Sequence, residues 1–121
     1  MITFYVSSYG KNDDKGIYII NLNEKKQEFS LVQHIVTQDY PSYMITKNNT
    51  LYIAYKNASR SNNGGGLGTF SIYKDELIIN NNYNSNGRSY THLCVSDNSR
   101  YLFAANYLVG STASYLLENM K

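Results

Sequence analysis

A repeat of about 50 residues constrains the fold of this chain more than any other feature of its sequence. Residues 41–49 are similar to residues 90–98, and a hydrophobic segment at 51–55 recurs at 101–105. An earlier copy of that segment stands at 3–7. Repeats of roughly 40–50 residues that each carry four strands are typical of β-propeller blades. The repeat therefore predicts a β-propeller.

The hydrophobic residues fall in short runs that are separated by polar, turn-forming residues. Runs bounded by Asn, Asp, Gly and Ser are typical of strands, and no segment has the spacing of a three-turn helix. The 13 tyrosines, with no Trp and a single Pro, also favour β-structure. We therefore expect an all-β chain with strands at 2–7, 16–22, 29–36, 43–46, 51–55, 67–73, 76–80, 92–95, 101–106 and 112–117.

A complete blade has four strands, which we letter A to D from the central channel outwards. The expected strands are distributed unevenly among three such blades. The first blade, 2–36, has strands B to D, the second, 41–80, is complete, and the third, 90–117, has strands A to C. The expected fold is one partial propeller domain over residues 1–121, with about two and a half antiparallel blades. Such a chain looks like the opening part of a larger ring.

Composition and charge exclude several classes of function. The chain has 11 Lys and Arg residues against 9 Asp and Glu residues, so nucleic acid is not an expected partner. The amino terminus has no signal-peptide pattern and no run approaches the ~18 apolar residues of a membrane span, so we expect a cytoplasmic protein. The single cysteine, Cys94, excludes an intrachain disulfide and a multi-cysteine zinc site. No cofactor or metal is expected.

Several phrases of the sequence resemble one known family. The longest, HLCVSDNSRYLFAANY, occupies residues 92–107 and is followed by Gly110 and Ser111. Shorter ones are YVSSY at 5–9, KGIY at 15–18, PSY at 41–43 and LYIA at 51–54. In their order along the chain, these phrases resemble the first blades of the lactonase-type seven-bladed propellers. That family contains the cycloisomerase-like 6-phosphogluconolactonases and fungal carboxymuconate cyclases.

The chain departs from that family at a few positions. Tyr90 stands where the family has a proline before the histidine, Tyr40 replaces the first residue of the phrase N-P-S-Y, and Ser7 and Ser8 replace glycine and threonine. None of these changes disturbs a strand. The larger departure is length, because the family's later blades, which carry its better-known His, Arg and Glu candidates, are absent.

Three residues are candidates for a functional site, the first of them through the resemblance. His92 aligns with the family's channel histidine, so it would hydrogen-bond a phosphate or lactone oxygen, or carry a proton. The alternative is a strand-start histidine that bonds the backbone of a neighbouring blade. Arg88, in the preceding loop, is a candidate phosphate ligand or a solvated loop residue. Tyr43 aligns with His92 in the repeat, so we expect both in one annular region, where Tyr43 lines a sugar-binding rim or packs against a neighbouring blade.

Other conspicuous residues have structural interpretations. The glycines at 64–68 lack the Lys and the helix of a phosphate loop, so they predict a flexible connection, as does the Asn-rich stretch at 80–87. Cys94 is expected to point inward as a small core residue. His34 has no acidic or cysteine neighbour, so it is expected to be a surface or half-buried structural residue.

The resemblance implies a 6-phosphogluconolactonase-like hydrolase, which acts on a phosphorylated sugar lactone in the pentose phosphate pathway. Because residues 1–121 hold only part of such a site, the isolated chain is expected to have little or no activity. The alternative is a catalytically inactive propeller fragment that self-associates through its open strand edges. A WD40 propeller is disfavoured, because Trp-Asp and Gly-His repeat marks are absent.

Overall fold

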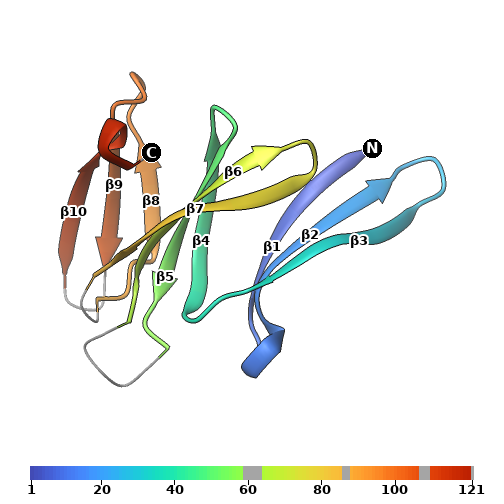
Figure 1. Ribbon diagram of the computed structural model, residues 1–121, viewed down its shortest axis with the longest axis horizontal. Coiled ribbons are helices and arrows are strands. Elements are labelled where there is room, and N and C mark those ends of the chain that lie inside the picture. Colours follow the sequence, from blue (N-terminus) through green and yellow to red (C-terminus); the bar gives the residue numbers. More distant parts are fainter. Residues whose placement is uncertain (59–63, 86–87, 107–109, 121) are drawn as a thin grey trace.

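The structure, a computed structural model, describes residues 1–58, 64–85, 88–106 and 110–120. Over these ranges it contains ten strands and two short 3₁₀ helices, arranged as three antiparallel sheets in chain order (Figure 1). The strands are β1 (Ile2–Tyr9), β2 (Lys15–Asn23), β3 (Glu28–Val36), β4 (Tyr40–Lys47), β5 (Thr50–Lys56), β6 (Gly66–Tyr73), β7 (Glu76–Asn84), β8 (His92–Val95), β9 (Tyr101–Asn106) and β10 (Ser111–Leu116).

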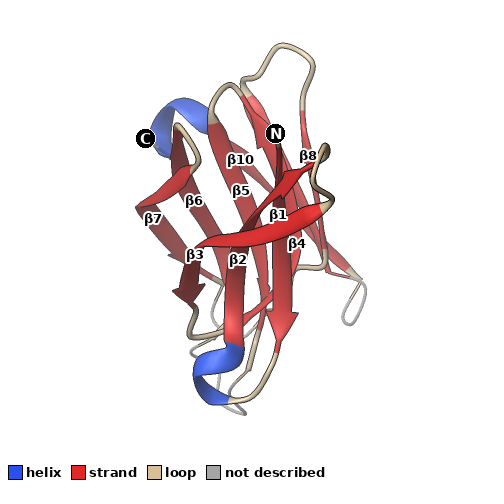
Figure 2. Ribbon diagram, turned by 90° about the vertical axis from the view of Figure 1, so that its right-hand side faces the viewer, coloured by secondary structure: helices blue, strands red, loops and turns tan. Residues whose placement is uncertain are grey.

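Each sheet is a meander in which consecutive strands pair. The first sheet has the order β1-β2-β3, the middle sheet β4-β5-β6-β7 and the third β8-β9-β10. The 3₁₀ helices η1 (Asn12–Asp14) and η2 (Leu117–Met120) lie at opposite ends of the strands (Figure 2). This arrangement confirms the predicted all-β partial propeller. The blade limits 2–36, 41–80 and 90–117 stay a prediction.

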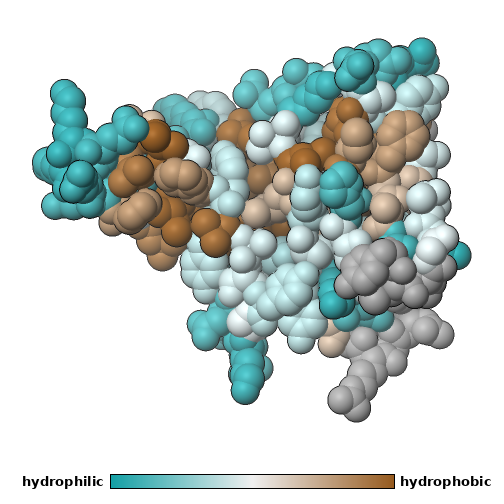
Figure 3. Space-filling model, turned by 180° about the vertical axis from the view of Figure 1, so that it is seen from behind, coloured by the Kyte–Doolittle hydropathy of each residue, from teal (hydrophilic) through white to brown (hydrophobic). Residues whose placement is uncertain are grey.

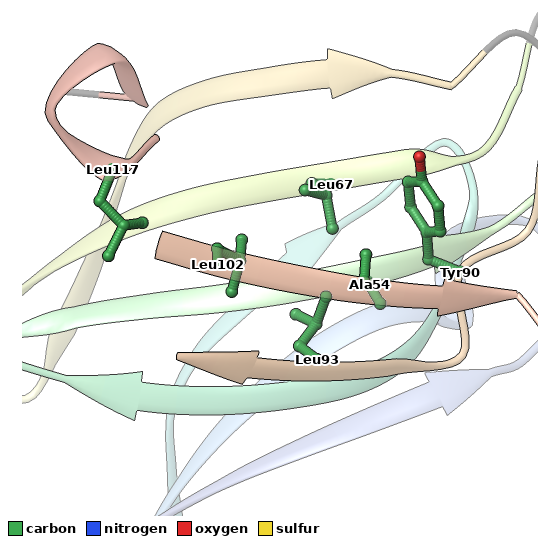
Figure 4. Packing of buried hydrophobic residues seen from close by; sticks show 7 residues of the cluster. Ala54, Leu67, Tyr90, Leu93, Leu102 and Leu117 are labelled. Carbon is green, nitrogen blue, oxygen red and sulfur yellow. The ribbon is translucent and has the colours of Figure 1, made fainter. Parts of the chain in front are cut away.

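The middle sheet is buried on both faces, which explains the almost uninterrupted hydrophobic sequence of β5. Side chains alternate across a strand, so Leu51, Ile53 and Tyr55 face the first sheet and Ala54 faces the third. The first interface is completed by buried residues that include Ile17, Ile19, Phe70 and Leu77. In the second, the side chains of Ala54, Leu67, Tyr90, Leu93, Leu102 and Leu117 meet, as Figure 4 shows.

Several strand limits differ from those expected, most of them by one or two residues, and the differences at β4, β7 and the last strand are described here. Strand β4 begins at Tyr40, and the last expected strand ends at Leu116, because η2 follows it. Strand β7 continues to Asn84 through residues expected to form a loop. Its pairing with β6 continues there, with Asn82 opposite Gly68, because the hydrogen bonds of a ladder come from the backbone and tolerate polar side chains.

The glycines at 64–68 form a closely packed segment, in which Gly64 and Gly65 lie in the expected connection and β6 begins one residue earlier than expected. Gly64, Gly65 and Gly66 are buried, and Gly66 already belongs to β6. Gly66 has φ +131°, and a β-carbon there would overlap the carbonyl oxygen of Tyr83. Glycine is therefore needed at this position because of both backbone conformation and space. The other half of the expected connection, residues 59–63, lies outside the described residues.

Asp39 holds both ends of the β5–β6 connection. Its carboxylate accepts hydrogen bonds from the backbone N–H of Ala58 (2.9 Å) and of Gly65 (2.8 Å). Burial, followed by the negative charge of Asp39, raises the pKa of Tyr55. Asp39 lies in the β3–β4 connection between the first two sheets. Its two hydrogen bonds therefore join that connection to the β5–β6 connection within the middle sheet.

Replacing Asp39 with alanine is expected to lower the free energy of unfolding by about 1–3 kcal/mol, because two partly buried N–H groups lose their acceptor. Urea denaturation followed by circular dichroism measures this change. Asp97→Ala, at an exposed turn, is the control and should change stability by about 0.5 kcal/mol or less. Equal effects of the two substitutions would contradict the anchoring role of Asp39.

Candidate functional site

The first strands of the three sheets, β1, β4 and β8, lie next to one another. Strand β4 packs against β1 on one side and β8 on the other. The Ser42 hydroxyl joins the last two sheets, because it lies 3.0 Å from the carbonyl oxygen of Ala54 and 2.6 Å from that of Tyr90. These strands therefore form one continuous surface, on which side chains from different sheets can meet.

Tyr43 and His92 meet across β4 and β8. Their ring centroids are 4.5 Å apart, with the ring planes inclined by 33°. Each residue stands opposite an alanine in its own sheet, Tyr43 opposite Ala54 and His92 opposite Ala105. Tyr43 is half-buried, whereas His92 is exposed. The structure thus brings together the two residues that the repeat aligns, and leaves the imidazole accessible to a ligand.

On its other side, Tyr43 lines a shallow depression between β1 and β4 with a volume of about 340 Å³. Its lining combines residues that carry hydroxyl groups, Tyr5, Ser7, Ser42 and Thr46, with the apolar residues Met44, Ile45 and Leu51. Burial, followed by the charge of Asp75, raises the pKa of Tyr5, so its hydroxyl stays protonated near neutral pH. Neutral hydroxyl groups donate and accept hydrogen bonds, so the depression is suited to polyhydroxylated ligands.

Arg88 lies apart from the two rings. It is exposed in the connection between β7 and β8, and its positive charge acts on the Tyr115 hydroxyl in β10. Burial and the Tyr90 hydroxyl, 3.1 Å away, raise the pKa of Tyr115, and Arg88 partly offsets that rise. Within the described ranges, no hydrogen bond or cation–π contact joins Arg88 to Tyr43 or His92.

The remaining reactive side chains have simple roles. His34 is half-buried and stacks on Tyr18 with ring centroids 4.0 Å apart, so the expectation of a structural residue is confirmed. Cys94 is exposed, so the expectation of a core residue is wrong. It shares a face with Phe103, and that face is not covered by another sheet of the described chain. Among the residues described, no three His, Cys, Asp or Glu side chains are grouped to hold a metal ion.

Sequence reasoning missed Ser42 and the hydroxyl-lined depression. The phrase PSY includes Ser42, but the residue's contact with the Tyr90 carbonyl spans 48 positions. Nothing local in the sequence signals such a contact. The period of the repeat, which aligns Tyr43 with His92, was the available signal for this region.

The stacked antiparallel sheets, with one surface formed by their first strands, define a β-propeller protein. The sequence matches the family described as "Lactonase, 7-bladed beta-propeller" over residues 3–121. The chain therefore belongs to the lactonase family of seven-bladed propellers. In the described residues, no helix has the length and hydrophobicity needed to cross a membrane.

Individual relatives agree with this family. The chain is 31% identical over 109 residues to a 6-phosphogluconolactonase of Bacillus subtilis (strain 168), covering 88% of this chain and 30% of that protein. It is 29% identical over 119 residues to an uncharacterized protein of Staphylococcus aureus (strain USA300), covering 97% and 34%. An uncharacterized protein of Lactococcus lactis subsp. cremoris (strain MG1363) is 25% identical over 114 residues, covering 93% and 32%. The chain thus spans about a third of these relatives, and no solved structure gives a significant match.

Proposed function

We propose that this chain forms part of a cytoplasmic 6-phosphogluconolactonase-like hydrolase, which converts 6-phosphoglucono-1,5-lactone to 6-phosphogluconate in the pentose phosphate pathway. The observation that carries the proposal is the contact between Tyr43 and His92 on the surface formed by the first strands. Membership of the lactonase family and the similarity to the Bacillus subtilis enzyme support it.

Hydrolysis of the lactone requires water to attack the carbonyl carbon while a base accepts a proton from that water. The ring C–O bond then breaks, and the leaving alkoxide takes up a proton. An imidazole can accept or donate a proton near neutral pH, which suits His92 to either transfer or to a hydrogen bond with the lactone oxygen. Tyr43 restricts the orientation of the imidazole and presents its own ring to the sugar.

Arg88 is the proposed ligand of the substrate phosphate. A guanidinium forms paired, charge-assisted hydrogen bonds with phosphate oxygens, and Arg88 is exposed four residues before His92. It would swing away from the neighbourhood of Tyr115 to do so. The groups that polarise the carbonyl and complete the site are proposed to lie outside residues 1–121.

A second candidate function is a catalytically inactive partial propeller that self-associates. The observation that favours it is the edges of the two three-stranded sheets, which among the described residues pair on one side only: β1 and β3 in the first sheet, β8 and β10 in the third. An unpaired strand edge offers N–H and C=O groups to a strand of another molecule. In this case the chain would bind other copies and have no catalytic role.

The lactonase proposal can be tested in a chimera in which this chain replaces the matching segment of the Bacillus subtilis enzyme. The folded chimera is expected to hydrolyse 6-phosphoglucono-1,5-lactone. His92→Ala is expected to lower its kcat by about 10²-fold, the lower end of the range for a general acid or base. His34→Ala, at the only other histidine of the chain, is the matched control and should retain the rate. Full activity of a folded His92→Ala chimera would contradict the proposed role.

The same chimera separates the role of Arg88 from that of His92. Arg88→Ala should raise KM for the phosphorylated lactone and leave KM for unphosphorylated glucono-1,5-lactone unchanged. His92→Ala should impair hydrolysis of both lactones. An equal effect of Arg88→Ala on both lactones would contradict its proposed role as a phosphate ligand.

A further inference from the structure

A groove with a volume of about 570 Å³ separates the middle and third sheets at the ends of β4 and β8. One wall comes from the β4–β5 turn and strands β5, β6 and β7, and the other from the β8–β9 turn and residues 116–118. His92 begins β8 and Tyr43 lies in the first half of β4, so the groove is at the opposite end of these strands from the candidate site. Sites for small molecules typically have volumes of about 300–1,000 Å³.

A β-bulge in β7 brings an amide group into this groove. Asn80 is the residue that the β6–β7 register skips, at a shift between Thr69 and Phe70. The hydroxyl of Ser71 donates a hydrogen bond to Asn80 Oδ1, 3.0 Å away. Ser71 is on the same side of β6 as Leu67, which faces the third sheet. Because a bulge redirects a side chain, Asn80 joins the polar lining and keeps its amide N–H groups for other partners.

Hydroxyl groups from β5 and β6 continue this polar wall. Tyr52 is half-buried and stands opposite Thr69. Burial, partly offset by a hydrogen bond from Thr50, raises the pKa of Tyr52, so its hydroxyl stays protonated near neutral pH. Thr69 is 1% exposed, and its hydroxyl is unpartnered within the described ranges. A buried hydroxyl without a partner costs free energy, so a hydrogen-bonding group that reaches it is stabilising.

Two cations stand on the opposite side of these hydroxyl groups, at the β8–β9 turn. Lys47 is half-buried, and its Nζ donates to the carbonyl oxygen of Ser96, 3.1 Å away. Arg100 follows Ser96 by four residues and also lines the groove. Over the part of the chain that the structure describes, no ion pair joins either cation to a carboxylate, although Glu118 is in the lining. An ammonium has three donors and a guanidinium five, so both retain capacity for an anion.

Side-chain hydrogen bonds fix the turn that carries Arg100. The side-chain oxygen of Asn98 accepts hydrogen bonds from the Ser96 hydroxyl (2.7 Å) and from the backbone N–H of Arg100 (3.1 Å). The Asn48 amide lies 3.4 Å from the Ser99 hydroxyl and joins the β4–β5 turn to this one. Because the two walls are already held together, a ligand would lose little free energy in ordering them.

We propose that this groove binds an anionic small molecule that carries hydroxyl groups. Lys47 and Arg100 would hold its phosphate or carboxylate, and the hydroxyl and amide groups of the middle sheet would bind its hydroxyl groups. Figure 3 shows hydrophilic residues along the upper edge of the molecule, the end at which the β4–β5 and β8–β9 turns lie in Figure 1. These polar groups all belong to residues 47–100 of two neighbouring sheets. The inference goes beyond the proposed lactone hydrolysis and does not depend on it.

Amide chemical shifts of the ¹⁵N-labelled chain test the proposal in titrations with three probes. D-Glucose 6-phosphate carries hydroxyl groups and a phosphate, D-gluconate carries hydroxyl groups and a carboxylate, and D-glucose is uncharged. The two anions are expected to shift the amides of Thr50, Ser71 and Arg100 in a saturable way, and glucose should not. A response to one anion alone also supports the site and identifies which acidic group it recognises.

Three substitutions test the role of charge in this site. Arg100→Gln is expected to weaken binding of the responding anion at least about tenfold, because charge-assisted hydrogen bonds are lost. Arg100 is exposed, so the variant should fold. Lys25→Gln removes a positive charge from the exposed β2–β3 turn and is the matched control, which should leave binding unchanged. Glu118→Gln removes the negative charge from the lining and should tighten binding.

Several results would overturn the inference. One is the absence of saturable shifts with both anions, and another is an equal response to glucose. Binding that survives Arg100→Gln, or that shifts the amides of Arg88 and His92 and not those of the groove, would place the anion elsewhere.

The chimera with the Bacillus subtilis enzyme tests the groove among further blades. It should bind the anion with similar affinity, and a loss of binding there would mean that other blades cover the groove. Arg100→Gln should leave lactone hydrolysis by the chimera unchanged, and His92→Ala should leave binding in the groove unchanged. The groove and the proposed lactonase function therefore fail independently.

Discussion

The isolated 121-residue chain is expected to hydrolyse 6-phosphoglucono-1,5-lactone at least about 10⁴-fold more slowly than the Bacillus subtilis relative. The chain spans 30% of that protein, and it provides only His92, Arg88 and Tyr43 as candidate site residues. Loss of one transition-state hydrogen-bond donor costs about 10²–10³-fold in kcat, and loss of a general acid or base costs a similar factor. Because several such groups are missing together, little catalysis should remain.

The measurement is the initial rate of acid release from the lactone, corrected for spontaneous hydrolysis and compared at equal molar concentrations of the two proteins. Circular dichroism on the same sample establishes that the chain is folded during the assay. A turnover number within tenfold of that of the relative would contradict this prediction. It would also mean that these residues form a complete site.

Phe70→Ala is expected to lower the free energy of unfolding by about 3–5 kcal/mol. Phe70 is among the largest fully buried side chains and packs between the first and middle sheets with Ile19 and Ile53. Truncation of this side chain removes hydrophobic contacts with both sheets and leaves a cavity between them. The strands cannot move together to fill the cavity, because backbone pairing holds them in their sheets. Domains of this size are stable by about 5–15 kcal/mol, so much of the total would be lost. Urea denaturation monitored by circular dichroism measures the change.

Tyr73→Ala is the matched control, because Tyr73 lies on the same strand and is 62% exposed. Its cation–π contact with Lys74 is at the surface and contributes about 0.5–1 kcal/mol. If Phe70→Ala cost no more than Tyr73→Ala, the first two sheets would not be packed face to face as described.

The strands were predictable because the hydrophobic pattern of this chain is local. Segment 51–55 alternates between two buried faces, and the turns around it are rich in Asn and Gly. The end of β7 was not predictable, since Asn82 pairs through its backbone with a glycine fourteen positions earlier. Side-chain polarity carries no information about that pairing. Strand patterns therefore locate strands better than they locate strand ends.

The candidate site was predictable only as far as the repeat extends. The repeat aligns Tyr43 with His92, and the structure places their rings in contact. Cys94 was assigned to the wrong environment, because alternation separates the two faces of β8 but does not say which face another sheet covers. Asp39 and Ser42 were missed because their partners lie 12 to 48 positions away. Such long-range contacts follow from the stacking of sheets and have no local sequence pattern.

The sheets stack in chain order, so that β4 and β8 hold Tyr43 against His92. Nuclear Overhauser contacts between the ring protons of these residues test it most directly, in a sample with labelled aromatic side chains. With ring centroids 4.5 Å apart, strong contacts between the two rings are expected. A folded chain that shows no contact between them, with the Tyr43 ring near residues of another sheet, would contradict both the stacking and the proposed site.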